Sequence, residues 1–153
     1  MEAWSDEEVV VVRLGGCRYA LPLPSVVEVG RPSGLTRVPG LPDWVCGVTN
    51  WRGRVLAVVD LRPLLSAPAA PLDRAGRLVV LVRGPVRLGL LAEAVEGTVA
   101  VPPEIEPVLA HLPAQSAALL AGHLTDAAGP VGVLDVAAVF GLAAALPRAR
   151  RAG

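Results

Sequence analysis

The chain is poor in the residues on which most metal sites and many enzymes depend. Its 153 residues include two cysteines and two histidines, at Cys17, Cys46, His111 and His123. A structural zinc site needs about four ligands in closely spaced pairs, and these residues form no such pairs. Two cysteines also provide no disulfide framework, so we expect reduced thiols in the core. The sequence therefore predicts no metal and no cofactor.

Net charge and long apolar runs are also absent. The 14 basic side chains balance 14 acidic ones, so there is no bulk basic field for nucleic acid or an anionic membrane. The one dense cationic run, 148–151, is interpreted as a solvated tail. No apolar stretch approaches the ~18 residues that cross a bilayer, and the acidic N-terminus does not resemble a signal peptide. We expect a cytoplasmic protein without a nucleic-acid partner or membrane insertion.

Motifs of familiar enzymes are missing as well. The sequence contains neither a G-x-S-x-G nucleophile elbow nor a G-x-x-x-x-G-K-[ST] phosphate loop. Acidic residues of the second half are scattered and are interpreted as solvated, namely Glu93, Glu96, Glu104 and Glu106. We predict no catalytic residues. The remaining enzymatic alternative is a small hydrolase that uses Cys46 or His123.

What the sequence does contain is a series of short β-branched segments between glycine and proline turns. Four hairpins and one further strand are predicted, at 9–21, 46–60, 78–92, 118–135 and 94–101. Helical turns are expected at 61–65 and 136–140, and irregular segments, the first with room for one short strand, at 30–43 and 104–116. Residues 25–29 fit either a helical turn or a short strand. The pattern predicts an all-β barrel or sandwich.

An internal repeat supports two related β half-domains. A shift of 75 positions without a gap places Gly47 on Gly122 and Asp60 on Asp135. The glycine turn at 15–16 has a similar counterpart at 84–85. Each aspartate follows a strand and precedes a short helical pattern, so we interpret both as helix N-caps.

The turn at 50–53 combines an aromatic ring and a guanidinium, in Trp51 and Arg52. These residue types dominate the energetically important positions of protein interfaces. The alternative is that Trp51 folds back onto the barrel and Arg52 is merely solvated. The residue types alone do not separate the two.

At this point the motifs resemble those of the CheW-type coupling proteins of bacterial chemosensory arrays. The family signature G-V-x-N-x-R-G corresponds to 47–53, and the strand ending in D-L-R corresponds to 59–62. Segments 19–23, 26–29, 35–39, 42–45, 86–91 and 95–97 are similar to further family segments. The resemblance covers about 9–142. Two positions depart from the pattern, since Trp51 stands where an aliphatic residue is usual and Gly30 replaces an apolar residue.

The resemblance implies an all-β fold of two small five-stranded β-barrel half-domains that share a central apolar core, with short helical turns. It implies one domain, 9–142, between flexible termini at 1–8 and 143–153. The residues implied to border a receptor groove are Val26, Glu28, Gly47, Thr49, Asn50, Trp51, Arg52 and Gly53. Arg62 is expected either to contact a partner or to form a structural salt bridge.

The same resemblance implies a non-catalytic adaptor, monomeric when free. Its implied partners are the cytoplasmic tip of methyl-accepting chemoreceptors and the regulatory domain of a CheA-type histidine kinase. The protein would be cytoplasmic and recruited to membrane-associated receptor arrays. The alternative within the same architecture is an adaptor for another output, such as surface motility or gene control.

Overall fold

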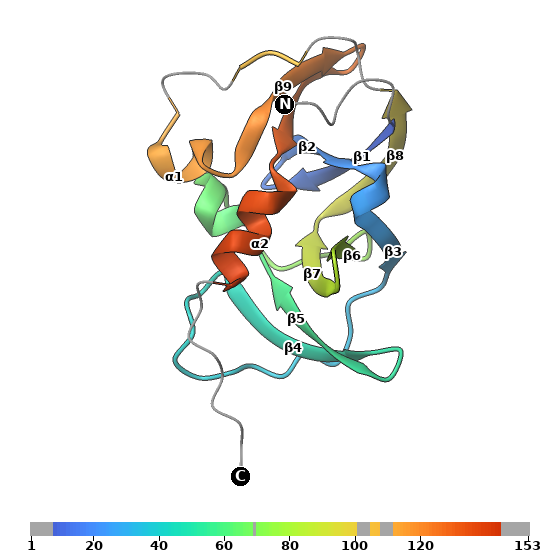
Figure 1. Ribbon diagram of the computed structural model, residues 1–153, viewed down its shortest axis with the longest axis vertical. Helices are drawn as coiled ribbons and strands as arrows, with labels where there is room; N and C mark the ends of the chain where they lie inside the picture. Colours follow the sequence, from blue (N-terminus) through green and yellow to red (C-terminus); the bar gives the residue numbers. More distant parts are fainter. Residues whose placement is uncertain (1–7, 69, 101–104, 108–111, 145–153) are drawn as a thin grey trace.

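The computed structural model describes residues 8–68, 70–100, 105–107 and 112–144 (Figure 1). These residues form ten strands: β1 (Glu8–Leu14), β2 (Cys17–Pro22), β3 (Val26–Gly30), β4 (Val45–Trp51), β5 (Arg54–Val59), β6 (Arg77–Arg83), β7 (Val86–Ala92), β8 (Ala94–Ala100), β9 (Leu120–Asp126) and β10 (Gly129–Leu134). Helices α1 (Ala114–Ala117) and α2 (Val136–Ala144) and two 3₁₀ turns, η1 (Leu23–Ser25) and η2 (Arg62–Leu65), complete the described fold. The predicted all-β class is confirmed.

The strands form two five-stranded sheets that exchange one strand each. One sheet has the order β8-β1-β2-β10-β9 and the other the order β3-β6-β7-β5-β4. β3 follows the β1–β2 hairpin in sequence but pairs with β6 of the other sheet, and β8 follows β6–β7 but pairs with β1. Figure 1 shows β8 beside β1 in the upper part of the molecule and β3 beside β6 below. Each repeat of the sequence therefore contributes strands to both sheets.

The predicted repeat is confirmed by the strand registers. Gly47 lies opposite Val58 on β4–β5, and the residues 75 positions later, Gly122 and Val133, lie opposite each other on β9–β10. The backbone N–H of Asp60 donates to the Trp44 carbonyl at 2.7 Å, and that of Asp135 donates to the Leu119 carbonyl at 2.8 Å. The two hairpins and the residues that follow them are thus built alike.

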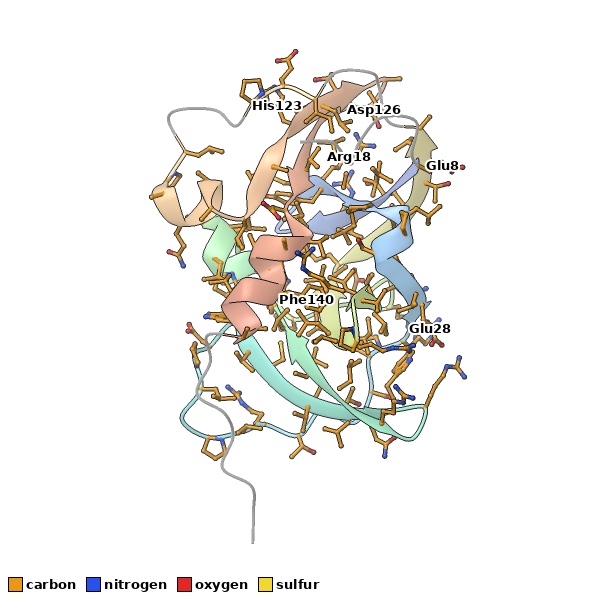
Figure 2. All side chains as sticks on the ribbon, in the orientation of Figure 1. Glu8, Arg18, Glu28, His123, Asp126 and Phe140 are labelled. Carbon is orange, nitrogen blue, oxygen red and sulfur yellow. The ribbon has the colours of Figure 1, made fainter. Side chains whose placement is uncertain are left out.

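The largest apolar cluster joins the two sheets. It contains buried residues from both, such as Val12 on β1, Leu81 on β6 and Leu134 on β10, and is covered by α2 through Phe140 (labelled in Figure 2). A separate smaller cluster fills the inner side of each sheet. Alternate residues of β1 enter different clusters, which explains its unbroken run of valines. The predicted shared core is confirmed.

The local predictions differ in outcome. For residues 25–29 the short strand is confirmed, since β3 begins at Val26, and the helical turn is wrong, because η1 ends at Ser25 instead of starting there. Segment 30–43 is irregular except at Gly30, which ends β3, and at Thr36, which forms an isolated bridge with Val48. The prediction for 104–116 is wrong at α1, where a turn of helix forms after a proline. Within that segment, Glu104 and His111 lie outside the described residues.

The ends of the domain extend slightly beyond the expected bounds. Glu8 already belongs to β1, where it lies opposite Ala100, and α2 continues to Ala144. The rest of the expected flexible termini, 1–7 and 145–153, lies outside the described residues. Cys17 is exposed and Cys46 half-buried, and both are free thiols, so the expected core position is wrong for Cys17. None of the helices in the described residues has the length and apolar character to cross a membrane.

Candidate functional site

The β4–β5 hairpin ends in a tight two-residue turn that presents Arg52. Arg52 and Gly53 have φ values of 50° and 78°, both positive as the favoured type I′ hairpin turn requires. The Asn50 side-chain oxygen accepts a hydrogen bond from the Gly53 backbone N–H at 3.1 Å. Asn50 and Gly53 therefore shape the turn, and its conformation directs the arginine side chain back toward β3.

Glu28 on β3 is the residue that holds the tip. Its carboxylate accepts from the Trp51 indole N–H at 3.0 Å and from the Arg52 Nε at 2.7 and 2.9 Å, and also from Arg52 Nη2. Figure 2 shows Glu28 on β3 beside the hairpin end. Because β3 and β4 are the two edges of their sheet, this contact joins one edge to the other. Trp51 folds back onto the barrel, as one of the two alternatives stated, whereas Arg52 is ion-paired and not merely solvated, although 74% of its side chain is exposed.

The same contacts set the charge state of the tip. Hydrogen bonds from Arg52, and then from Trp51, lower the pKa of Glu28 to about 2. The stabilisation from a carboxylate with a lowered pKa is present above its ordinary range and is lost as the pH falls toward the folded value. The tip is therefore held together at neutral pH and released only in strong acid.

This titration is directly measurable. In the wild-type protein, the side-chain carbonyl resonance of Glu28 is expected to titrate near pH 2, by carbon-detected NMR. In Arg52→Gln the midpoint is expected to move up toward that of an ordinary glutamate, because the largest cause of the shift is gone. A Glu28 midpoint that stays low in the variant would contradict this cause.

Trp51 packs on the one residue of β3 without a side chain. A Cβ atom at Gly30 would overlap Cη2 of Trp51 and lie 3.0 Å from Cζ2. The indole also contacts the apolar cluster inside the β3–β7 sheet. The two departures from the family pattern are thus one compensating pair, in which a small residue on β3 accommodates a large one on β4.

Gly30→Val is expected to lower the free energy of unfolding by about 1–3 kcal/mol, because it overpacks this contact. Adding Trp51→Val should recover most of the loss, and denaturant unfolding of the two single variants and the double variant gives the coupling. Additive effects would contradict a direct contact between the Trp51 ring and residue 30.

Gly47 and Thr49 lie beneath the 33–37 segment instead of at the surface. A Cβ atom at Gly47, where φ is 135°, would overlap the Thr36 carbonyl oxygen. Thr49, which is 5% exposed, donates its hydroxyl to the Ser33 carbonyl at 2.7 Å. Val26 packs against the central core. These three predicted site residues position the tip, whereas Glu28, Trp51 and Arg52 meet at it.

Arg62 lies outside the tip, in a buried polar network. Its side chain donates to both Asp60 carboxylate oxygens, at 3.0 and 2.9 Å, to the Ala70 carbonyl at 2.8 Å and to Glu93 at 3.0 Å. Glu93 accepts in turn from the Gly16 backbone N–H at 3.0 Å. With 4% of its surface exposed, Arg62 joins η2 to the β1–β2 turn. Of the two expected roles, this geometry favours the structural one.

The two repeat aspartates act as predicted, as acceptors for the backbone that follows. Asp60 accepts from the Arg62 N–H at 3.0 Å and Asp135 from the Ala138 N–H at 3.1 Å. Only Asp60 also binds an arginine side chain, because the position equivalent to Arg62 is Ala137.

This difference provides a matched test. Asp135→Ala is expected to lower the free energy of unfolding by about 0.5–2 kcal/mol, as the loss of a cap does. Asp60→Ala should cost more, because it also removes a carboxylate from a buried arginine. Equal midpoints in urea for the two variants would contradict a stabilising Asp60–Arg62 pair.

A second polar network was missed at the sequence level. Arg18 on β2 binds Glu96 of β8 and Asp126 at the end of β9. The two acidic partners lie 78 and 108 positions from Arg18 in the sequence, and Glu96 was interpreted as solvated, so no local pattern indicated the network. Among the described residues, no three or more histidine, cysteine or acidic side chains are grouped so that they could hold a metal ion.

Comparison with known proteins agrees with this architecture. The family model for the CheW-like domain matches residues 8–144. The chain is 37% identical to Protein FrzA of Myxococcus xanthus over 66% of its length, 34% identical to Protein PilI of Pseudomonas aeruginosa over 63%, and 28% identical to Chemotaxis protein CheW of Bacillus subtilis over 65%. These matches cover 63%, 53% and 64% of the relatives' own lengths, less than two thirds in each case.

A solved structure shows the same fold. The scaffolding protein TtCheW from Thermoanaerobacter tengcongensis superposes with a TM-score of 0.78. The superposition covers 86% of this chain and 85% of that one, at 21% sequence identity. At this identity the match concerns the fold.

Proposed function

Because the chain belongs to the CheW-like domain family, we propose that it is a non-catalytic adaptor that couples chemoreceptor tips to a CheA-type histidine kinase. The observation that carries the proposal is the hairpin tip, where Glu28 fixes an exposed arginine and a half-buried tryptophan. An ordered guanidinium beside an aromatic ring is a surface for protein contact. In this role the protein is a cytoplasmic monomer when free and is recruited to membrane-associated receptor arrays.

The geometry supports a physical account of coupling. A receptor helix lies against the tip, where the guanidinium of Arg52 fixes its orientation and apolar side chains supply contact area. The tip is braced on both sheet edges through Glu28, so a displacement of the helix is passed to the barrel as a whole. A small shift of this kind changes the kinase only if its two activity states bind the adaptor with different affinities.

The hydrolase alternative has little support in the geometry. Burial raises the pKa of the Cys46 thiol to about 11, whereas a nucleophilic cysteine needs a lowered one. His123 is engaged at both ring nitrogens, with Nδ1 3.0 Å from the Pro107 carbonyl and Nε2 3.2 Å from Glu106. We therefore keep the adaptor role.

Co-sedimentation tests the coupling itself. Receptor-tip fragments assembled on vesicles, mixed with the kinase of the same organism, are expected to sediment the kinase only when this chain is added. Kinase that sediments equally without the chain, or remains in solution with it, would contradict the adaptor role.

A second candidate is an adaptor of the same kind whose kinase serves an output other than chemotaxis, such as surface motility or gene control. It is supported by the similarity to FrzA and PilI, 37% and 34% identical, which stands beside an equal similarity to proteins named CheW, such as the 36% identical one of Rhizobium etli. Deleting the gene separates the two, because loss of gradient tracking with normal surface movement and gene expression would contradict this candidate.

A further inference from the structure

The two sheets place an arginine at equivalent positions but surround it differently. Ala20 on β2 and Gly89 on β7 each lie opposite the equivalent valine of the repeat, in the two parallel strand pairs. Arg18 and Arg87 precede these two residues by the same number of positions, so they are equivalent as well.

Arg18 is saturated with carboxylates of its own chain. Its Nη1 and Nη2 bind the two oxygens of Asp126, each at 2.7 Å, and its Nε binds Glu96 at 2.9 Å. Figure 2 shows Arg18 and Asp126 in the upper sheet. The arginine side chain is 12% exposed. Asp126 thus acts as an internal ligand, supplied by the hairpin tip of its sheet.

Arg87 has no such ligand. Within the part of the chain that the structure describes, it is exposed and takes part in no ion pair. The tip position equivalent to Asp126 is Trp51, since each pairs with the first residue of the following strand. Glu28, which is close enough for Arg87 to contribute to its lowered pKa, already accepts from Trp51 and Arg52.

The surroundings of Arg87 add to this cationic excess. Strand alternation places Arg87 on the same side of the sheet as Gly89 and Leu91, which face the cluster inside it. Residues 26–92, which include the whole β3–β7 sheet, contain nine arginines and four carboxylates, a formal charge of +5. The other described residues contain two arginines and six carboxylates, a charge of −4. The neutral chain is therefore polarised, and its basic part contains the proposed receptor site.

We propose that Arg87 binds an acidic side chain of the receptor helix. The carboxylate of that side chain would occupy the position next to Arg87 that the Asp126 carboxylate occupies next to Arg18. The inference rests on the proposed function and names the chemistry of the partner at the same site. Trp51 keeps that position free of an acid of the chain's own, and Arg52 prevents Glu28 from filling it. The partner helix supplies the missing carboxylate, in a bidentate pair that also fixes its register.

Titration calorimetry of the full chain with a soluble receptor-tip fragment of the same organism tests the inference. Arg87→Gln is expected to weaken binding by about tenfold, as the loss of a charged hydrogen-bonded pair does, and to flatten the dependence of Kd on salt. The matched control is Arg83→Gln, which removes the same charge from the neighbouring β6 and is expected to change Kd by less than about twofold. Replacing each acidic residue of the fragment by its amide should identify one whose loss is not additive with Arg87→Gln.

The outcomes separate the inference from the function on which it rests. In one contrary outcome the wild-type chain binds the fragment and Arg87→Gln has the same Kd; in another, Arg87→Gln and Arg83→Gln lose affinity equally. Either result would overturn the inference and leave the adaptor role intact. A loss confined to binding of the kinase regulatory domain would overturn the assignment to the receptor. Failure of the wild-type chain to bind the fragment would overturn both.

Discussion

Replacing Arg62 by alanine is expected to lower the free energy of unfolding by about 3 kcal/mol, the largest single effect on stability that we predict. Arg62 is buried and donates to Asp60, Glu93 and the Ala70 carbonyl. The variant leaves the carboxylate of Asp60 without a cation, and Asp60 is a buried residue with 8% of its surface exposed. A buried charge without its partner costs far more than the intact pair contributes.

Denaturant unfolding measures this effect, with Arg54→Ala as the control. Arg54 is an exposed arginine of β5 that takes part in no ion pair among the described residues, so its variant should unfold at the wild-type midpoint. If Arg62→Ala also unfolds at that midpoint, the network does not stabilise the fold, and a partner-binding role for Arg62 becomes the better account.

Reversing the charge of Arg52 is expected to have the opposite pattern of effects. Arg52→Glu places two carboxylates together at the tip and removes the guanidinium offered to the receptor, so binding of a receptor-tip fragment should weaken by tenfold or more. Thermal unfolding should change little, because both charged groups are in contact with water and their repulsion is screened.

The control for Arg52→Glu is Arg74→Glu, which changes the net charge equally at an exposed position in the loop before β6. Calorimetry with the same fragment should give this variant nearly wild-type affinity. An Arg52→Glu protein that binds as tightly as the control would remove the tip from receptor recognition. An unfolded one would show that the Glu28–Arg52 contact is needed for the fold.

The parts of the structure that the sequence predicted are those specified locally. The glycine turns, the β-branched hairpins and the two capping aspartates depend on residues within a few positions of one another. The repeat at a fixed spacing then predicted the matching registers of β4–β5 and β9–β10. Local pattern and fold agree here because the same turn chemistry occurs in both repeats.

What the sequence did not predict depends on contacts between distant segments. β3 and β8 are short strands. The alternation of apolar and polar side chains along them does not indicate which strand each pairs with, so their exchange between the two sheets could not be predicted. Gly30 and Trp51 were noted as separate departures, because they lie on opposite edges of a sheet whose strand order was unknown. The ion pair between Arg62 and Glu93 also joins residues that lie far apart, 31 positions, in the sequence.

The predicted site was resolved into two groups of residues for a related reason. A sequence motif contains both the residues that shape a turn and the residues that the turn presents to solvent. Only the structure distinguishes the two groups, because only the structure shows which residues are buried. Gly47 and Thr49 anchor the 33–37 segment, whereas Glu28, Trp51 and Arg52 form the contact at the tip. The two arginines of the signature, Arg52 and Arg62, accordingly have different expected effects on binding and stability.

The central claim is that this chain connects to a histidine kinase, and calorimetric titration with the isolated regulatory domain of a CheA-type kinase from the same organism tests it most directly. We predict saturable binding with a Kd in the micromolar range or tighter, retained by Arg52→Glu, whose change lies at the receptor site. Absence of binding to every such regulatory domain of the organism would contradict the adaptor role, even though the two-sheet fold would stand.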